Sequence, residues 1–294
     1  MTTRLESTTR TSECLRSAGP GLRIFIEEGF EERCRRAGLT SGEGFDALMA
    51  SARRVPGGRS EHRILDSATP PIRLRAYEHG GLLAPILGGR FLSPNRPMRE
   101  LRLWRALRDR GIPMPTPVLA SGRRHGLFWR LVFGSLDRGD AKDGAEWLAQ
   151  EPSDADLREA CVAFARALRR LHDAGGMHGD LHPRNVLFEE FGEQGTLRCM
   201  LIDLDRGRLY PRISSRRRVR ELLRFARSLE KTGRRDLLSR RHRALVLSAY
   251  CESDRALRRS MLRWARFEAI DLDRHRVAWR MARRRSGVSA ARPR

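Results

Sequence analysis

The sequence has almost no lysine, few cysteines and no long apolar run. Lysine occurs only at Lys142 and Lys231, so arginine supplies the other 57 of the 59 basic residues. The five cysteines are scattered without CxxC spacing, which excludes a disulfide framework and a zinc site and is typical of a reducing, cytoplasmic environment. No apolar run approaches the roughly 18 to 20 residues of a membrane-spanning helix. No apolar segment follows the first arginine either, so we expect no cleaved secretory signal.

The sequence does contain enough apolar residues for a core, and it carries a large positive charge. Its 294 residues are 40% hydrophobic, which suits one large domain or a two-lobed unit. The net charge is +23, and residues 206–294, with 28 basic and 8 acidic residues, contribute +20 of it. This part attracts polyanions such as anionic lipid, phosphorylated glycolipid or nucleic acid. The alternative is a solvated arginine-rich helical surface that reflects genomic base composition.

The first half of the chain mixes helical and extended patterns. Residues 1–20 are rich in Thr, Ser and Arg and predict a disordered lead-in. Spaced apolar residues over 25–52 favour helix with a short break at 42–44, and 55–91 combines short extended runs with Gly and Pro. A helix over 98–108 and an apolar strand over 127–133 follow. We interpret 21–135 as a small, β-rich α+β lobe.

The second half is predominantly helical. Ser153 or Asp154 caps a helix, and apolar residues recur on one face of it at spacings of three and four: Leu157, Cys161, Phe164, Leu168 and Leu171. Two short apolar strands, over 185–188 and 198–202, flank a turn, and the pattern after residue 210 is helical to about 285. We therefore predict a larger, helical lobe over 136–285 and a basic tail over 286–294.

The most informative segment follows the capped helix. It reads MHGDLHPRNVL over 177–187, and LIDLD follows over 201–205. An aspartate, an asparagine five positions later and a strand-ending aspartate resemble the catalytic and metal-binding loops of the protein-kinase-like fold. In that arrangement Asp180 accepts the proton of the attacking hydroxyl. Asn185 and Asp203 supply the hard oxygen ligands that Mg²⁺ needs to hold ATP.

Two neighbouring residues have less defined roles. We group His178 with Asp180 in the catalytic loop and expect it to brace the loop by hydrogen bonds rather than to transfer protons. Asp205 either supports the site, contacts the substrate or pairs with the adjacent Arg206. No long activation segment or Ala-Pro-Glu sequence follows Asp203, so a small-molecule or glycolipid hydroxyl is a better acceptor than a protein.

The same fold requires a phosphate-covering loop and a basic residue in the first lobe. Gly57 and Gly58, within VPGGRS over 55–60, form the candidate loop. No lysine precedes Lys142, so we predict that Arg75, in a candidate strand over 73–77, replaces the usual strand lysine, with Glu100 of the following helix as its partner. The alternative for Arg75 is an ordinary surface arginine.

An ordered series of further segments resembles the 3-deoxy-D-manno-octulosonic acid (Kdo) kinase family of lipopolysaccharide kinases. The segments are LRAYEHGGL over 74–82, RELRL over 99–103, GIPMPTPV over 111–118, HGLF over 125–128, IDLDRG over 202–207 and RSLEK over 227–231. The resemblance covers about residues 50–235 and implies a two-lobed protein-kinase-like fold. It also implies ATP-dependent phosphorylation of a sugar hydroxyl on the lipid A core. An arginine in the strand after the glycine loop is also acceptable in that family, which supports Arg75. The triplet HPR over 182–184 and the basic C-terminal part depart from the family and leave the acceptor sugar open.

The resemblance also implies a partner and a location. The acceptor would be lipopolysaccharide at the cytoplasmic face of the inner membrane, where arginines near 216–220 would dock a peripheral enzyme on an anionic leaflet. The uncharged run GGLLAPILGG over 80–89 either dips into the interface or is a buried loop. The sequence leaves the oligomeric state open.

Two other functions are compatible with parts of the sequence. The catalytic loop alone also resembles aminoglycoside and choline phosphotransferases, which would make the protein a cytosolic small-molecule kinase. A kinase-like protein without catalysis, binding polyanions through its arginine-rich half, is the other alternative. Such a binding module does not need Asp180, Asn185 and Asp203, so nucleic acid is not the partner that we expect.

Overall fold

The computed structural model describes residues 15–17, 21–55, 62–79, 87–192, 195–231 and 239–266. The chain divides into two compact units, residues 1–140 with 203–205 and residues 141–202 with 206–294. The division lies five residues beyond the predicted lobe boundary at 135, and it adds residues 203–205 to the first unit, which the sequence did not predict. The candidate glycine loop at Gly57 and Gly58 and the basic tail over 286–294 lie outside the described residues, as does most of the run over 80–89.

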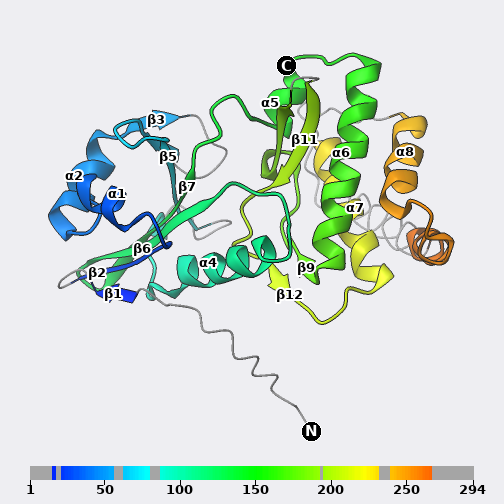
Figure 1. The fold of residues 1–294 in the computed structure, drawn as a ribbon. Helices are drawn as coiled ribbons and strands as arrows, with labels where there is room; N and C mark the ends of the chain where they lie inside the picture. Colours follow the sequence, from blue (N-terminus) through cyan, green and yellow to red (C-terminus); the bar gives the residue numbers. More distant parts are fainter. Residues whose placement is uncertain are drawn as a thin grey trace, which may run out of the picture. The chain divides into compact units, whose positions relative to one another are not determined.

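The first unit contains a seven-stranded antiparallel sheet in the order β1-β2-β6-β7-β5-β4-β3 (Figure 1). Its strands are β1 (Leu15–Ser17), β2 (Leu22–Ile26), β3 (Arg53–Val55), β4 (His62–Leu65), β5 (Ile72–Ala76), β6 (Pro117–His125) and β7 (Phe128–Leu136). β1 pairs with β2, so residues 15–17 of the predicted disordered lead-in form a strand. Residues 1–14 and 18–20 of that lead-in lie outside the described residues.

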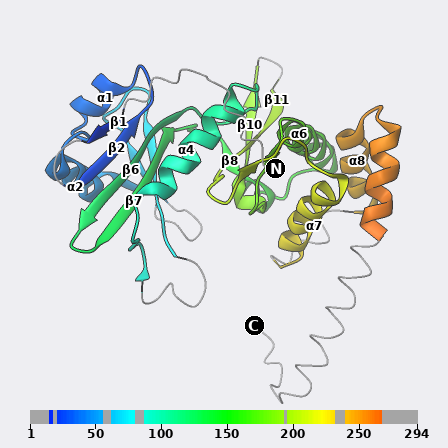
Figure 2. The same cartoon turned by 90° about the horizontal axis from the view of Figure 1, so that it is seen from below.

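Helices cover both faces of this sheet (Figures 1 and 2). α1 (Glu31–Arg36) and α2 (Gly42–Ser51) contribute Cys34 and Phe45 to a core that also contains Ile24 of β2 and Val132 of β7. α4 (Asn95–Arg108) packs on β6 and β7. Its Trp104 ring lies 5.0 Å from the ring of Phe133, which follows Val132 and points to the opposite face.

The prediction of helix from residue 25 was wrong for its first part. Leu22, Ile24 and Ile26 alternate at period two and point into the core, because β2 pairs with β1 and β6. The break between the two helices comes before residue 42, where Gly38 adopts a φ of 74° and ends the first helix. Ser41 then caps α2 by accepting the Gly44 N–H.

The second unit is organised around α6 (Asp154–Asp173), as the apolar spacing predicted. Ser153 is its N-cap, and all five residues of the predicted apolar face are buried: Leu157, Cys161, Phe164, Leu168 and Leu171. α6 packs against β11 and α8 (Figure 1). The helix ends at Asp173 with Ala174 as its C-cap, and Gly175 follows with a φ of 82°. A Cβ on Gly175 would lie 2.2 Å from the carbonyl oxygen of Tyr210.

Short strands and further helices complete this unit. A three-stranded sheet has the order β11-β10-β8, and a two-stranded one pairs β9 with β12. These strands are β8 (Lys142–Asp143), β9 (Gly176–Met177), β10 (Val186–Phe191), β11 (Thr196–Leu201) and β12 (Arg208–Leu209). The helices are α5 (Gly144–Ala149), the 3₁₀ turn η2 (Pro183–Asn185), α7 (Ser215–Lys231), α8 (Arg240–Cys251) and a helix over 255–266. The predicted helical pattern after residue 210 is therefore confirmed for 215–231, 240–251 and 255–266. Among the described residues, no helix combines the length and the apolar character needed to cross a bilayer.

Candidate functional site

The catalytic-loop segment leaves β9 in a conformation that requires glycine. Gly179 has a φ of 79°, a region that residues with a Cβ rarely adopt. A Cβ on Gly179 would lie 2.4 Å from the backbone oxygen of Arg206. β9 pairs with β12, with Met177 opposite Arg208. This pairing places the segment after residue 205 beside the loop that follows β9. The loop next to Asp180 is therefore packed directly against the backbone of residue 206.

A buried carboxylate on α7 holds the backbone of this loop. The N–H groups of His178 and Gly179 donate to Glu221, at 3.1 Å and 2.6 Å. Burial alone would raise the pKa of Glu221, but hydrogen bonds from His172 and Gly179 outweigh it and hold the pKa below its usual value. Glu221 is therefore an ionised acceptor for two backbone donors of the loop.

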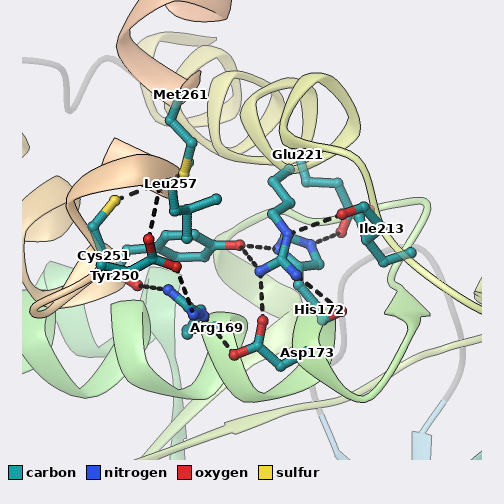
Figure 3. A network of polar contacts seen from close by, with 11 residues as sticks. Arg169, His172, Asp173, Ile213, Glu221, Tyr250, Cys251, Leu257 and Met261 are labelled. Atoms are coloured by element: carbon teal, nitrogen blue, oxygen red, sulfur yellow. Dashed lines mark hydrogen bonds and ion pairs between the residues drawn. The ribbon is translucent and has the colours of Figure 1, made fainter. Parts of the chain in front are cut away.

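Glu221 is in turn part of a buried network that reaches α8 (Figure 3). His172 of α6 lies 2.9 Å from Glu221 through Nε2 and 2.6 Å from the hydroxyl of Tyr250 through Nδ1. Arg218 donates to the same hydroxyl at 3.1 Å and to Asp173 at 2.7 Å. Since a carboxylate only accepts, the proton of neutral His172 is on Nε2, and the Tyr250 hydroxyl donates to Nδ1. Burial lowers the pKa of His172, which agrees with a neutral ring.

The side chain of His178 has the bracing role expected from the sequence. It is fully buried, and its Nε2 lies 2.9 Å from the carbonyl oxygen of Ile202. This contact joins the loop to the end of β11. The hydrogen bond is of the bracing kind that the sequence predicted, and the absence of a proton-transfer role for His178 stays a prediction.

Asp180 and Asn185 are connected within the second unit. Asn185 donates from Nδ2 to the carbonyl oxygen of Asp180 at 3.0 Å, and its own carbonyl accepts the Ile202 N–H at 3.0 Å. The Asp180 carboxylate is partly exposed and has an arginine near each oxygen. Arg206 Nη1 lies 3.9 Å from Oδ2, and Arg224 Nη1 lies 3.7 Å from Oδ1.

In the first unit, Arg75 forms an ion pair with its predicted partner, Glu100. Its Nη2 lies 2.6 Å from Oε2 of Glu100, its Nη1 lies 3.0 Å from Oδ1 of Asp203, and Glu100 also accepts from the Tyr77 hydroxyl. Strand alternation explains the contact, because Ile72 and Leu74 point into the core while Arg75 points to the face that α4 covers. Burial raises the pKa of Glu100 to about 7, although the Arg75 guanidinium opposes this shift. Arg75 is thus a buried, paired residue and not an ordinary surface arginine.

Asp203 has an unusual backbone conformation, and Asp205 forms an ion pair with an arginine of α4. Asp203 has a φ of 60°, in the left-handed region that non-glycine residues adopt mainly where function or local contacts require it. Asp205 does not pair with the adjacent Arg206, one of the alternatives left open by the sequence. It accepts from Nε of Arg96 at 2.6 Å and from a second nitrogen of the same guanidinium. Arg96 is on α4, and nothing in the sequence predicted it as a partner of Asp205.

The proposed magnesium ligands suit a cation that arrives with ATP. The described residues contain no cluster of three His, Cys, Asp or Glu that would hold a metal by itself. Mg²⁺ bound to a nucleotide typically uses one or two protein oxygens, phosphate oxygens and waters. Asn185 uses Nδ2 for the Asp180 carbonyl, so its amide oxygen remains as a ligand, and Asp203 offers a partly exposed carboxylate. Each side chain by itself therefore offers the type of oxygen that Mg²⁺ binds, and their use as magnesium ligands stays a prediction.

Sequence reasoning missed the residues that hold the loop from outside it. Glu221 and Tyr250 are far from the loop in sequence, and His172, which is close to it, lies on the preceding helix α6. One signal was available for Glu221, which is the only acidic residue between 206 and 229 in a segment dominated by arginine. An isolated acid in a helix that otherwise bears positive charge is a candidate for a buried, paired position.

Comparisons with known proteins show the family to which the chain belongs. The model of the lipopolysaccharide kinase (Kdo/WaaP) family matches residues 51–250. A 3-deoxy-D-manno-octulosonic acid kinase of Xylella fastidiosa (strain 9a5c) is 31% identical over 215 residues, which cover 71% of this chain and 79% of the relative. One of Stenotrophomonas maltophilia (strain K279a) is 34% identical over 180 residues, 60% of this chain and 68% of the relative.

A solved structure, described as WaaP in complex with acyl carrier protein, has a similar fold. It aligns with a TM-score of 0.50 at 19% identity and covers 83% of this chain and 98% of that chain. This similarity confirms the protein-kinase-like fold predicted from the sequence. With the family match spanning most of the described residues, the chain is a phosphotransferase that belongs to the lipopolysaccharide kinase (Kdo/WaaP) family.

Proposed function

We propose that this chain transfers the γ-phosphate of ATP to a hydroxyl of Kdo, or of another inner-core sugar, in lipopolysaccharide. The observation that carries the proposal is the fixed loop around Asp180, whose backbone donates to Glu221 and whose carbonyl accepts from Asn185. The relatives named Kdo kinase support the class of acceptor. A loop held in this way keeps one partly exposed carboxylate in a constant orientation, as a catalytic base requires.

Asp180 is the proposed base in this reaction. It accepts the proton of the sugar hydroxyl as the oxygen attacks the phosphorus, and it orients that hydroxyl. His178 has no proton-transfer role in the proposal and positions the loop through Ile202. Asn185 and Asp203 would hold Mg²⁺, which neutralises charge on the transferring phosphoryl group when it is bound with ATP.

Arg75 is the proposed partner of the ATP phosphates in the first unit. Glu100 and the ring of Tyr77, 4.5 Å from the guanidinium carbon, fix its orientation. A guanidinium held in this way has further donors for phosphate oxygens, which it binds in a forked geometry that lysine lacks. Gly57 and Gly58 remain the proposed phosphate-covering loop.

We further propose that the enzyme works as a peripheral protein on the cytoplasmic face of the inner membrane. The acceptor is a glycolipid in an anionic leaflet, and the C-terminal part of the chain carries most of the positive charge. Basic residues near such a surface contribute roughly 1 kcal/mol each to binding. Binding to vesicles that contain anionic lipid, and its loss at high salt, tests this location separately from catalysis.

Catalysis is tested with the purified protein, ATP, Mg²⁺ and Kdo-lipid A, with mass spectrometry of the lipid. We expect the wild type to add one phosphate and Asp180→Asn to lose at least about 100-fold in rate, the low end of a general-base contribution. Asp109→Asn, which removes an exposed carboxylate of the first unit, is the matched control and should act as the wild type does. Equal rates for the wild type and Asp180→Asn would contradict the role of Asp180. Phosphorylation of an aminoglycoside or choline, without transfer to the lipid, would favour a small-molecule kinase.

A further inference from the structure

We propose that Arg206 and Arg224 form a binding subsite for an anionic group of the acceptor, next to Asp180. The ligand is an oxyanion carried by the sugar or by its immediate neighbour, a carboxylate or a phosphate. The subsite would make the enzyme select acidic acceptors and would present their hydroxyl to Asp180. This inference rests on the proposed function, because it assigns a recognition role beside the proposed base.

Independent contacts hold the two arginines beside the loop. Arg206 is placed by its backbone, which packs on Gly179 and precedes the pairing of β12 with β9. Arg224 is on α7, three residues after Glu221, so the turn of helix that binds the loop N–H groups also carries this guanidinium. The backbone of both arginines is therefore fixed beside the loop, within reach of Asp180 for each side chain.

The charges around Asp180 are not balanced. Two guanidinium groups lie 3.7 Å and 3.9 Å from its two oxygens, so the three groups together carry an excess of one positive charge. These distances are longer than hydrogen bonds. Among the described residues, neither guanidinium donates a hydrogen bond, and the two side chains are 61% and 48% exposed. Each arginine thus faces solvent next to the proposed base with its donors available to a ligand.

This arrangement suits an oxyanion better than a neutral sugar. A guanidinium has five N–H donors in a planar fork, which matches a carboxylate or a phosphate. A second anion at this position would balance the excess charge without displacing Asp180, because the arginines reach different oxygens of its carboxylate. The alternative is that the arginines serve only to orient Asp180, and that alternative predicts no discrimination between charged and neutral acceptors.

The test compares three acceptors in steady-state kinetics. They are Kdo-lipid A, its Kdo methyl ester, which lacks the carboxylate charge, and Kdo-lipid A from which the lipid A phosphates have been removed. The variants are Arg206→Ala, Arg224→Ala and the double variant, and Arg243→Ala on α8 is the control. Arg243 is exposed and carries the same charge in the same unit. Unchanged thermal unfolding and circular dichroism establish that each variant is folded.

We expect the double variant to raise the KM for Kdo-lipid A by about 10- to 100-fold, the effect of losing charge-assisted hydrogen bonds, with little change in the KM for ATP. In the wild type, the acceptor that lacks the recognised anion should show a similar rise, and this rise should disappear in the double variant. A rise with the ester identifies the carboxylate as the ligand, and a rise with the dephosphorylated lipid identifies the phosphate. Equal KM values for all three acceptors in the wild type, or a variant effect on ATP alone, would overturn the proposal.

Binding measurements separate this proposal from the proposed function. If the wild type phosphorylates none of the three lipids, the proposed acceptor class is wrong. Calorimetric titration with inorganic phosphate and with free Kdo then decides about the subsite. Binding that the double variant loses and Arg243→Ala keeps would support an anion subsite with another acceptor. Binding that is equal in all three proteins would overturn it.

Discussion

Glu221 accepts the backbone N–H of Gly179 at 2.6 Å, across 42 residues of sequence. The carboxylate that holds the proposed catalytic loop is therefore on a helix that begins only 12 residues after Asp203. No long activation segment lies between Asp203 and α7. A residue of α7, Glu221, binds the backbone of the loop instead. Glu221 contacts the backbone next to Asp180 and not its carboxylate, so we expect it to be a positioning residue.

Glu221→Gln should lower kcat by about 10- to 100-fold with a small change in the KM for ATP, because it disturbs the loop and not the nucleotide contacts. A glutamine amide has one acceptor oxygen, so its NH₂ group would face either the Gly179 N–H or the donors of His178 and His172. The mismatch in a buried site should destabilise the second unit by about 2 to 4 kcal/mol. Steady-state kinetics and urea unfolding measure the two effects.

Glu190→Gln is the control for this variant, since Glu190 is an exposed carboxylate on β10 of the same unit. It should change neither quantity. An unchanged kcat in a folded Glu221→Gln protein would show that the loop does not depend on this carboxylate.

Tyr250→Phe should weaken the same network from its other end. The change removes the hydroxyl that donates to His172 and accepts from Arg218, which leaves buried polar atoms without a partner and costs about 1 to 3 kcal/mol. The loss in kcat should be smaller than for Glu221→Gln, since Glu221 keeps both backbone donors. Thermal unfolding and kcat are compared with Tyr210→Phe, whose hydroxyl has no hydrogen bond among the described residues. A Tyr250→Phe protein as stable as Tyr210→Phe would contradict the role of the hydroxyl.

The parts of the protein that depend on local sequence were predicted, and those that depend on distant packing were not. The capped helix α6 follows from Ser153 and the apolar spacing after it, and the spacing of Asp180, Asn185 and Asp203 predicted the fold. Arg75 and Glu100 are paired as expected, because strand and helix periodicity place both on one face. Whether these residues do the chemistry assigned to them stays a prediction.

Two kinds of feature were beyond the sequence. The apolar pattern over 22–26 is too short to distinguish a strand from a helix. These residues form strand β2 because they pair with β1 and β6. The contacts of Glu221 and of the Tyr250 hydroxyl form only when α7 and α8 pack beside α6. Sequence periodicity reports which face of a helix is buried, and it does not report which polar group the buried face meets.

Arg75→Ala should raise the KM for ATP by about 10- to 100-fold, because a buried guanidinium proposed to bind phosphate is lost. It should also destabilise the first unit, since it leaves the buried Glu100 without its cation, at a cost of about 3 to 5 kcal/mol. Arg75→Lys keeps the charge but reaches fewer partners, so its effects should be intermediate.

Arg73→Ala, two residues earlier on the same strand, is the matched control. It loses an ion pair with Asp137, whose carboxylate is nearly buried, so it also destabilises the first unit, but it should not change the KM for ATP. Equal KM values for ATP in Arg75→Ala and Arg73→Ala would remove Arg75 from the nucleotide site.

His62 should make the first unit less stable in mild acid. Burial, with the nearby Arg75 and Arg73, lowers the pKa of His62 to about 4, below the roughly 6.5 of an unfolded chain. Between these values the unfolded chain binds the proton and the folded chain does not, so the free energy of unfolding falls as the pH falls from about 6.5 to 4. The neutral His62→Gln lacks this dependence, and its curve should be flatter by up to about 3 kcal/mol over that range.

Urea unfolding at several pH values between 4 and 7.5 measures this difference. His172, whose pKa burial also lowers, contributes in the same direction but is present in both proteins, so it cancels when His62→Gln is compared with the wild type. His125→Gln removes an exposed ring of the same unit and is the control, with a curve expected to follow that of the wild type. If the His62→Gln curve is parallel to the wild-type curve instead, His62 is protonated in the folded protein as readily as in the unfolded chain. The acid sensitivity of the first unit must then come from other groups.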